Sequence, residues 1–142
     1  MKGEYPTLSH TILLLIGLLA TSLIVVSATI SLSITEKNLV STQLNSIADS
    51  VKNEILESYS LANQSSNYTA GTFKLDVPDE IGNKKYSIQL SQGMLLLNTS
   101  VRSEQIVAVR SLTIGAELNG KSFLPASIKI DKQNNIIKIG LV

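Results

Sequence analysis

The chain has 142 residues, 44% of them hydrophobic, and a formal net charge of +1, which suits one domain of ordinary size and an appendage. Because it contains no cysteine, disulfides, thiol catalysis and Cys-ligated zinc are excluded, and the near-neutral charge gives no electrostatic footprint for nucleic acid. The single histidine, His10, excludes a nucleophile–histidine pair farther along the chain, so we expect neither an enzyme nor a cofactor.

The stretch between His10 and Glu36 carries no charged residue. Residues 11–35 read TILLLIGLLATSLIVVSATISLSIT, and as a helix they would span roughly 37 Å, enough for a hydrocarbon layer of ~30 Å. A core helix of a small domain keeps a polar face, and this stretch has no charged face. We therefore expect a membrane-spanning helix. A cleaved secretory signal, with its cleavage site at Val26-Ser27-Ala28, is the open alternative.

The first residues bear on whether this helix is retained. Lys2-Gly3 precedes Glu4, and the long apolar run follows. This arrangement resembles the class III signal of archaeal type IV pilin-like proteins. The resemblance implies that residues 1–3 are a leader, which a prepilin peptidase removes between Gly3 and Glu4, and that the apolar helix is retained. Bacterial pilins have a glutamate at the fifth mature position, where this chain has Leu8.

One face of the apolar stretch carries small or weakly polar side chains at a spacing of three and four residues. Its positions are Gly17, Thr21, Ile24, Ala28, Ser31 and Thr35. Small side chains let helix backbones approach closely, and hydroxyls can bond across such a contact or back to their own helix. This small-residue stripe favours helix–helix association. Ordinary Ser/Thr scatter in a solitary anchor is the alternative.

The helix is expected to continue over residues 36–62, because no Pro or Gly occurs between Leu18 and Asn67. Apolar positions recur there at steps of three and four, which predicts an amphipathic face. That face consists of Val40, Leu44, Ile47, Val51, Ile55 and Tyr59. Charged residues such as Asp49 fall mainly elsewhere and are expected to be solvated. The helix should end near Leu61, because residues 63–71 are rich in Asn, Ser, Thr and Gly and predict a loop.

From Thr72 the period changes to two, so residues 72–142 are expected to form a β-rich head. The expected strands are Thr72–Val77, Lys85–Leu90, Met94–Asn98, Ile106–Leu118 with a bend near Gly115, Ala126–Ile130 and Ile136–Leu141. Turns are expected at Ser91-Gln92-Gly93 and over residues 131–135. A head of about 70 residues lies near the lower limit for a self-sufficient core. We therefore expect one sheet face to pack on the amphipathic face of the helix.

The expected fold is thus α+β. A long N-terminal helix, hydrophobic over residues 4–35 and amphipathic over residues 36–62, packs on a small antiparallel β-sheet or β-sandwich head. This layout also resembles archaeal pilins, whose heads are commonly β-sandwiches.

Two groups of polar residues are candidate sites. Asp76, Asp79 and Glu80 form an acidic cluster in DVPDEIG, and carboxylates in a loop can bind a hard cation. Their spacing matches no known cage, so solvated acids at a strand end are expected and no metal site is predicted. Three sequons begin at Asn63, Asn67 and Asn98. Asn63 and Asn67 fall in the expected loop, where glycans or an unmodified polar surface are the two alternatives.

The resemblance implies a structural subunit, major or minor, of an archaeal type IV pilus-like filament. Its helix would hold it in the cytoplasmic membrane, head outside, before assembly at the cell surface. The implied partners are membrane lipid, copies of itself or other pilin-like subunits, the prepilin peptidase and the pilus assembly machinery. One alternative is a single-pass surface protein whose outer β domain binds a partner or ligand. The other is an exported soluble binding protein cleaved near Ala28.

Overall fold

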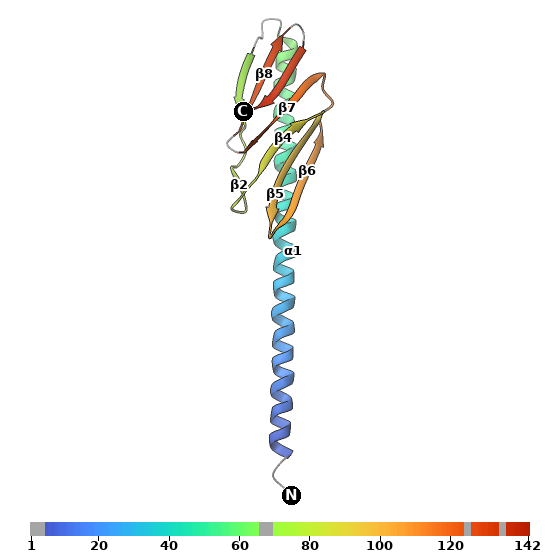
Figure 1. The fold of residues 1–142 in the computed structure, drawn as a ribbon, viewed down its shortest axis with the longest axis vertical. Coiled ribbons are helices and arrows are strands. Elements are labelled where there is room, and N and C mark those ends of the chain that lie inside the picture. The colour runs from blue at the N-terminus through green and yellow to red at the C-terminus, as the bar shows by residue number, and fades with distance from the viewer. Residues whose placement is uncertain (1–4, 66–69, 124–125, 134–135) are drawn as a thin grey trace. The chain divides into compact units, whose positions relative to one another are not determined.

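The computed structural model describes residues 5–65, 70–123, 126–133 and 136–142. They form one helix and nine strands, shown in Figure 1. These are α1 (Tyr5–Gln64), β1 (Ala70–Lys74), β2 (Glu80–Ile81), β3 (Lys84–Lys85), β4 (Ser87–Ser91), β5 (Met94–Val101), β6 (Glu104–Ser111), β7 (Ala116–Phe123), β8 (Ser127–Gln133) and β9 (Ile136–Leu141). The chain divides into two compact units, Met1–Asn38 and Leu39–Val142.

The described part of the first unit is entirely helical. Pro6 lies in the first turn of α1, where the missing backbone N–H would have no partner within the helix in any case. No further Pro follows before Gln64, and the only Gly is Gly17. The helix therefore meets no strong breaker along its length.

The second unit is built on one seven-stranded sheet in the order β1-β8-β9-β7-β4-β5-β6. Its pairings are antiparallel except for the parallel pair β7–β9. A separate short hairpin joins β2 to β3. The expected α+β layout is confirmed. Of the two alternatives for the head, a single sheet is observed rather than a sandwich.

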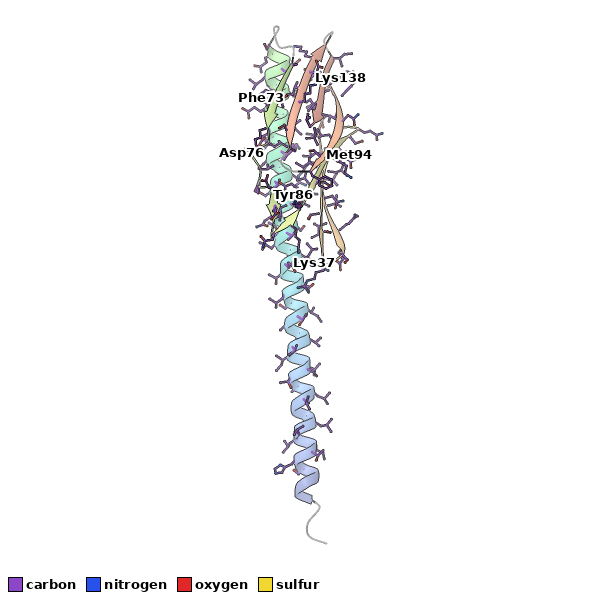
Figure 2. The ribbon with its side chains drawn as sticks, turned by 60° about the vertical axis from the view of Figure 1, so that its left-hand side comes forward. Lys37, Phe73, Asp76, Tyr86, Met94 and Lys138 are labelled. Carbon is purple, nitrogen blue, oxygen red and sulfur yellow. The ribbon has the colours of Figure 1, made fainter. Side chains whose placement is uncertain are left out.

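The core of this unit lies between the sheet and residues 40–62 of α1, and Figure 2 shows that side chains fill this space. The expected apolar face of the helix is buried from Val40 to Ile55, and Tyr59 is partly buried. Ala48 and Ala62 are also fully buried beside it. Each large apolar side chain removed from water in this way contributes ~1.5–3 kcal/mol. The helix face thus completes a core that the strands alone could not close.

Several strand boundaries differ from the sequence-based expectation. β1 occupies residues 70–74 instead of 72–77, and β5 extends to Val101 instead of Asn98. The expected bent strand Ile106–Leu118 is two strands, β6 and β7, separated by residues 112–115. The separation has a topological reason: β6 pairs with β5, whereas β7 lies on the far side of β4. The chain must leave the sheet to cross between these positions.

Two-residue turns with left-handed backbone join three of the hairpins. Their residues are Gly82-Asn83, Gln92-Gly93 and Arg102-Ser103, all with positive φ. Such turns match the right-handed twist of the flanking strands. The turn expected after Ser91 is confirmed. The turn at Arg102-Ser103 contains no Gly or Asn, so no turn signal marked it in the sequence.

Gly120 lies where β7 passes from one partner to another. β7 pairs with β9 as far as Asn119 and with β4 from Asn119 to Phe123. At Gly120 φ is +136°, and a Cβ there would lie 2.6 Å from the backbone nitrogen of Leu141. Only glycine fits this approach, because any side chain would displace the end of β9.

Replacing Leu44 tests the contribution of the helix face to the head. Its side chain is fully buried, so Leu44→Ala should lower the free energy of unfolding by about 2–5 kcal/mol. Leu61, which is 54% exposed on the same helix, provides the matched control, because Leu61→Ala should change stability by no more than about 0.5 kcal/mol. Denaturant unfolding of the full chain in detergent measures both. Equal losses for the two variants would contradict the packing described here.

Candidate functional site: the apolar helix surface and the polar contacts of the head

The apolar surface of α1 between Ile12 and Ile34 is not covered by any described residue. The large hydrophobic side chains in this range are between 51% and 67% exposed, and side chains project around the whole helix (Figure 2). By length and composition alone, α1 is long and apolar enough to cross a membrane. Large apolar surfaces of this kind mark contacts with lipid or protein.

The hydroxyl groups of this surface bond to their own helix. Thr21 Oγ1 donates to the carbonyl oxygen of Gly17 at 2.6 Å, and Thr29 Oγ1 donates to that of Val25 at 2.8 Å. Ser22 and Thr35 donate to Leu19 and Ser31 in the same manner. On the small-residue stripe, Thr21 and Thr35 thus bond back to their own helix. Because these four donors are satisfied locally, they can enter an apolar environment without losing a hydrogen-bond partner.

The small-residue stripe leaves space beside the helix. A Cβ placed on Gly17 would meet no atom within 4 Å. The positions between Gly17 and Thr35 all lie in α1, at the spacing expected from the sequence. The residues expected to direct processing, Lys2, Gly3 and Glu4, lie outside the described residues.

The sequons fall in different surroundings. Asn63 is exposed on the last turn of α1, because the helix ends at Gln64 rather than near Leu61. Asn98 is half-buried in β5, between β4 and β6, and the neighbouring Thr99 is buried and donates a hydrogen bond to the carbonyl oxygen of Lys85 at 2.9 Å. A folded head therefore presents Asn63 and restricts access to Asn98. Asn67 lies outside the described residues.

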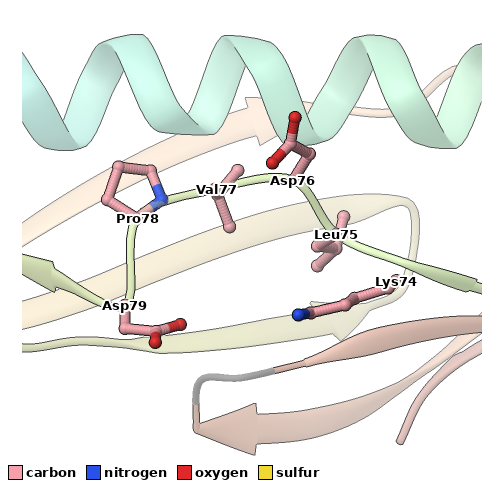
Figure 3. Close-up of a pocket in the computed structure, with 6 residues that line it drawn as sticks. All are labelled: Lys74, Leu75, Asp76, Val77, Pro78 and Asp79. Atoms are coloured by element: carbon pink, nitrogen blue, oxygen red, sulfur yellow. The ribbon is translucent and has the colours of Figure 1, made fainter.

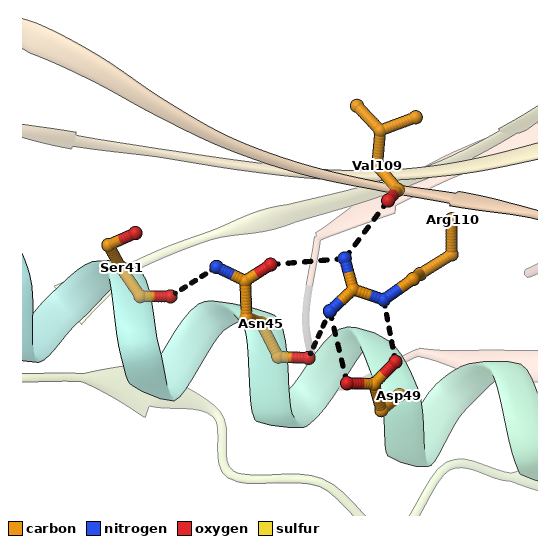
Figure 4. A network of polar contacts seen from close by, with 5 residues as sticks. All are labelled: Ser41, Asn45, Asp49, Val109 and Arg110. Carbon is orange, nitrogen blue, oxygen red and sulfur yellow. Dashed lines mark hydrogen bonds and ion pairs between the residues drawn. The ribbon is translucent and has the colours of Figure 1, made fainter.

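Arg110 connects the edge strand β6 to the helix, as Figure 4 shows. Its Nε and Nη2 donate to the two carboxylate oxygens of Asp49 at 2.6 and 3.0 Å. Its Nη1 donates to Asn45 Oδ1 at 3.0 Å and to the carbonyl oxygen of Val109 at 3.0 Å. Asn45 is held in turn by a bond from its Nδ2 to the carbonyl oxygen of Ser41 at 2.8 Å. The planar guanidinium thus bridges strand and helix in a two-point geometry that a lysine could not reproduce.

Asp49 is solvated as expected, and this contact adds an ion pair that the sequence did not indicate. The Asp49 side chain is 58% exposed, and Arg110 is 24% exposed. The hydrogen bond from Arg110 lowers the pKa of Asp49, outweighing the opposing effect of burial, and the same bond raises the pKa of Arg110. The partners are 61 positions apart in the chain, so no local pattern could have linked them.

Lys132 of β8 caps the C-terminal end of α1. Its Nζ donates to the carbonyl oxygens of Ala62 and Ser65 at 2.9 and 3.0 Å. The last turn of the helix contains no basic residue of its own. A cation from the sheet therefore satisfies carbonyls that the helix leaves unpaired and opposes the negative end of its dipole.

The acidic segment after β1 lines a shallow pocket with Lys74, Leu75 and Pro78, shown in Figure 3. The Asp76 carboxylate points toward the helix there, whereas Asp79 lies at the other end of the segment. Among the described residues, no group of three His, Cys, Asp or Glu side chains could hold a metal ion. The segment contributes packing instead, because the Tyr86 hydroxyl donates to the carbonyl oxygen of Pro78 at 2.5 Å.

Burial raises the pKa values of two side chains beside this segment, Tyr86 and Glu54. It raises the pKa of Tyr86, and the negative charge of Asp79 adds to the effect. It also raises the pKa of Glu54 on α1, against the hydrogen bond that the backbone of Asp76 donates to that carboxylate. Tyr86 therefore stays protonated and keeps donating to Pro78 throughout the neutral range.

Comparisons with known protein families, with characterised proteins and with solved structures found no match to this chain. Its function must therefore be inferred from its own residues.

The contact between Asp49 and Arg110 predicts a pH-dependent stability. Because the pKa of Asp49 is lowered in the folded chain, its contribution is present above the ordinary value of 3.8 and is lost as the pH falls through the folded value. Asp49→Asn should lower the urea midpoint at pH 7, and the difference from the unmodified chain should disappear in acid below that value.

Three further variants make this measurement specific. Glu57→Gln removes a carboxylate from the same helix and corrects for the general loss of negative charge. Arg110→Gln should reproduce the loss at pH 7, and the double variant should be no less stable than either single one, since both remove one interaction. A difference between Asp49→Asn and the unmodified chain that persists undiminished in acid would contradict this assignment.

Proposed function

We propose that the chain is a structural subunit of an archaeal type IV pilus-like surface filament. One observation carries the proposal: the exposed apolar surface from Ile12 to Ile34 belongs to a helix that runs on into the core of a β head. Such a helix can lie in lipid before assembly and against equivalent helices afterwards. The helix thereby keeps its apolar surface away from water in both states.

The mechanism is physical and assigns no catalytic residue. The prepilin peptidase would remove residues 1–3 on the cytoplasmic side, leaving Glu4 as the first residue of the mature subunit. The assembly machinery would then extract the helix from the cytoplasmic membrane while the head stays outside. Exchange of lipid for neighbouring helices involves no net loss of apolar burial, so close packing decides which faces meet.

The internal bonds of the hydroxyls support this exchange. Thr21 and Thr29 donate to carbonyl oxygens of their own helix, so moving from lipid to a helix bundle breaks none of these bonds. The small-residue stripe then allows helices to approach closely, with Gly17 offering the closest approach of its six positions. These features support subunit packing over a solitary anchor.

A second candidate is a single-pass surface protein whose β domain binds a partner. The face of the sheet opposite α1 favours this reading, because it exposes Met94, Val107 and Val109 by 42%, 47% and 48%. In that case the helix would serve only as an anchor and the leader would remain.

The mass of the mature N-terminus separates these functions. A subunit should begin at Glu4, an anchor at Met1, and a secreted domain cleaved after Ala28 at Thr29. Gly3→Leu should block maturation, because the peptidase requires the small residue at the cleavage point, and surface filaments should disappear. Lys2→Arg keeps the charge and should mature normally. A Gly3→Leu chain of mature size with normal filaments would refute the proposal.

A further inference from the structure

The seven-stranded sheet has two edges that no other described strand covers. β1 pairs only with β8, and β6 pairs only with β5. A strand at an edge presents a row of backbone N–H and C=O groups to any extended segment beside it. A further strand can therefore pair with the sheet at either of these two edges.

The outward groups of β6 follow from its hairpin. The turn Arg102-Ser103 closes on the pair Val101–Glu104, and in a two-residue hairpin the closing pair exchanges both hydrogen bonds. Alternate residues then face outward, beginning with Gln105. The residues whose backbone groups face outward are Gln105, Val107, Val109 and Ser111. Val107 and Val109 also expose apolar side chains.

The same reasoning applies to β1 through its neighbour. The backbone N–H and C=O groups of Ser127 exchange hydrogen bonds with Val142 at 3.0 and 2.9 Å, so they point away from β1. The backbone groups of the next residue, Ile128, therefore point toward β1. Ile128 pairs with Phe73, so the backbone groups of Phe73 point to β8. Those of Thr72 and Lys74 therefore point outward.

The strand directions make the two edges complementary. Five of the six pairings between β1 and β6 are antiparallel and one is parallel, so β1 and β6 run in opposite directions. A second copy placed beside the first in the same orientation offers its β1 to β6 of the first, and the two strands meet antiparallel. Pairing β6 with β6 antiparallel would instead require inverted copies.

We propose that like-oriented copies of this chain join edge to edge, with β1 of one copy pairing antiparallel with β6 of the next. The inference rests on the proposed function for the common orientation, since subunits held in one membrane by the same helix share one polarity. The contact is heterologous, so it leaves a free edge at each end and can propagate.

One register sets apolar residues of the two edges opposite one another. With Thr72 of one copy opposite Val107 of the next, Phe73 falls opposite Ile106 and Ala70 opposite Val109. Phe73 is 38% exposed and Ile106 is only partly buried in the single chain. Aromatic and β-branched residues opposite one another stabilise antiparallel pairs. Shifting the register by two residues would place Phe73 opposite Glu104 or Ala108.

Arg110 limits the length of the contact. Its Nη1 already donates to the carbonyl oxygen of Val109, which keeps one lone pair for a second donor. The fully available part of the edge is thus centred on Gln105 and Val107. This matches the short length of β1, which ends at Lys74.

Cysteine cross-linking tests the pairing, because the chain has no cysteine of its own. Residues opposite each other in a hydrogen-bonded antiparallel pair have Cα atoms about 5.5 Å apart, within the range that a disulfide spans. The double variant Thr72→Cys/Val107→Cys of the full chain, oxidised on intact cells, should give a ladder of dimers, trimers and larger species. Each single variant should give none, and a mixture of the two single variants should stop at dimers.

The control pairs Thr72→Cys with Lys121→Cys, which lies on the interior strand β7, and should give no ladder. Dimers from Val107→Cys alone, dimers without larger species from the double variant, or no cross-linking would each overturn the edge pairing. The readout is separate from that of the proposed function. Filaments of subunits beginning at Glu4 but without a ladder would refute only the pairing, and a ladder among unprocessed membrane-bound chains would refute only the filament.

Discussion

The apolar surface of one helix must be shielded from water in two different ways, and the rest of the structure depends on this constraint. From Val40 onward its apolar face is buried against a sheet of its own chain, whereas from Ile12 to Ile34 no described residue covers the apolar side chains. Exposing apolar surface to water costs ~25 cal/mol of free energy per Å². Under the proposed function this covering comes from lipid before assembly and from other helices afterwards, and both suit a stretch of helix without charged residues.

The head depends on the packing of its sheet against the helix face from Val40 onward and on two polar contacts between sheet and helix. The sheet is a single layer, and among the described residues the core on its inner face is completed by the helix together with Leu75, Ile81 and Tyr86, which lie outside this sheet. Arg110 fastens the edge strand β6 to Asp49 near one end of that helix segment, and Lys132 binds the carbonyls at the other end. Both cations come from the sheet and act on groups of the helix. They keep the single layer in place while its edges remain available to other copies.

Local patterns in the sequence were sufficient for the helix and for most of the head. The lack of charge between His10 and Glu36 and the three-and-four spacing from Val40 to Tyr59 identified the exposed and buried parts of α1, because helical periodicity depends only on neighbouring residues. The parallel pairing of β7 with β9 and the Asp49–Arg110 contact were not predictable, since each joins residues far apart in sequence. The turn at Arg102-Ser103 was missed because neither residue is typical of a left-handed turn, and the strand division after Ser111 follows from topology alone.

Substitution of Gly17 tests the central claim most directly, because a side chain there meets no atom of the same chain within 4 Å. An effect of Gly17→Leu on assembly would therefore not arise from a clash within the chain. Ser22→Leu, on the opposite side of the helix, is the matched control for added volume and hydrophobicity. The account predicts that both variants insert in the membrane and mature normally, and that only Gly17→Leu loses surface filaments. Normal filaments from Gly17→Leu would contradict it.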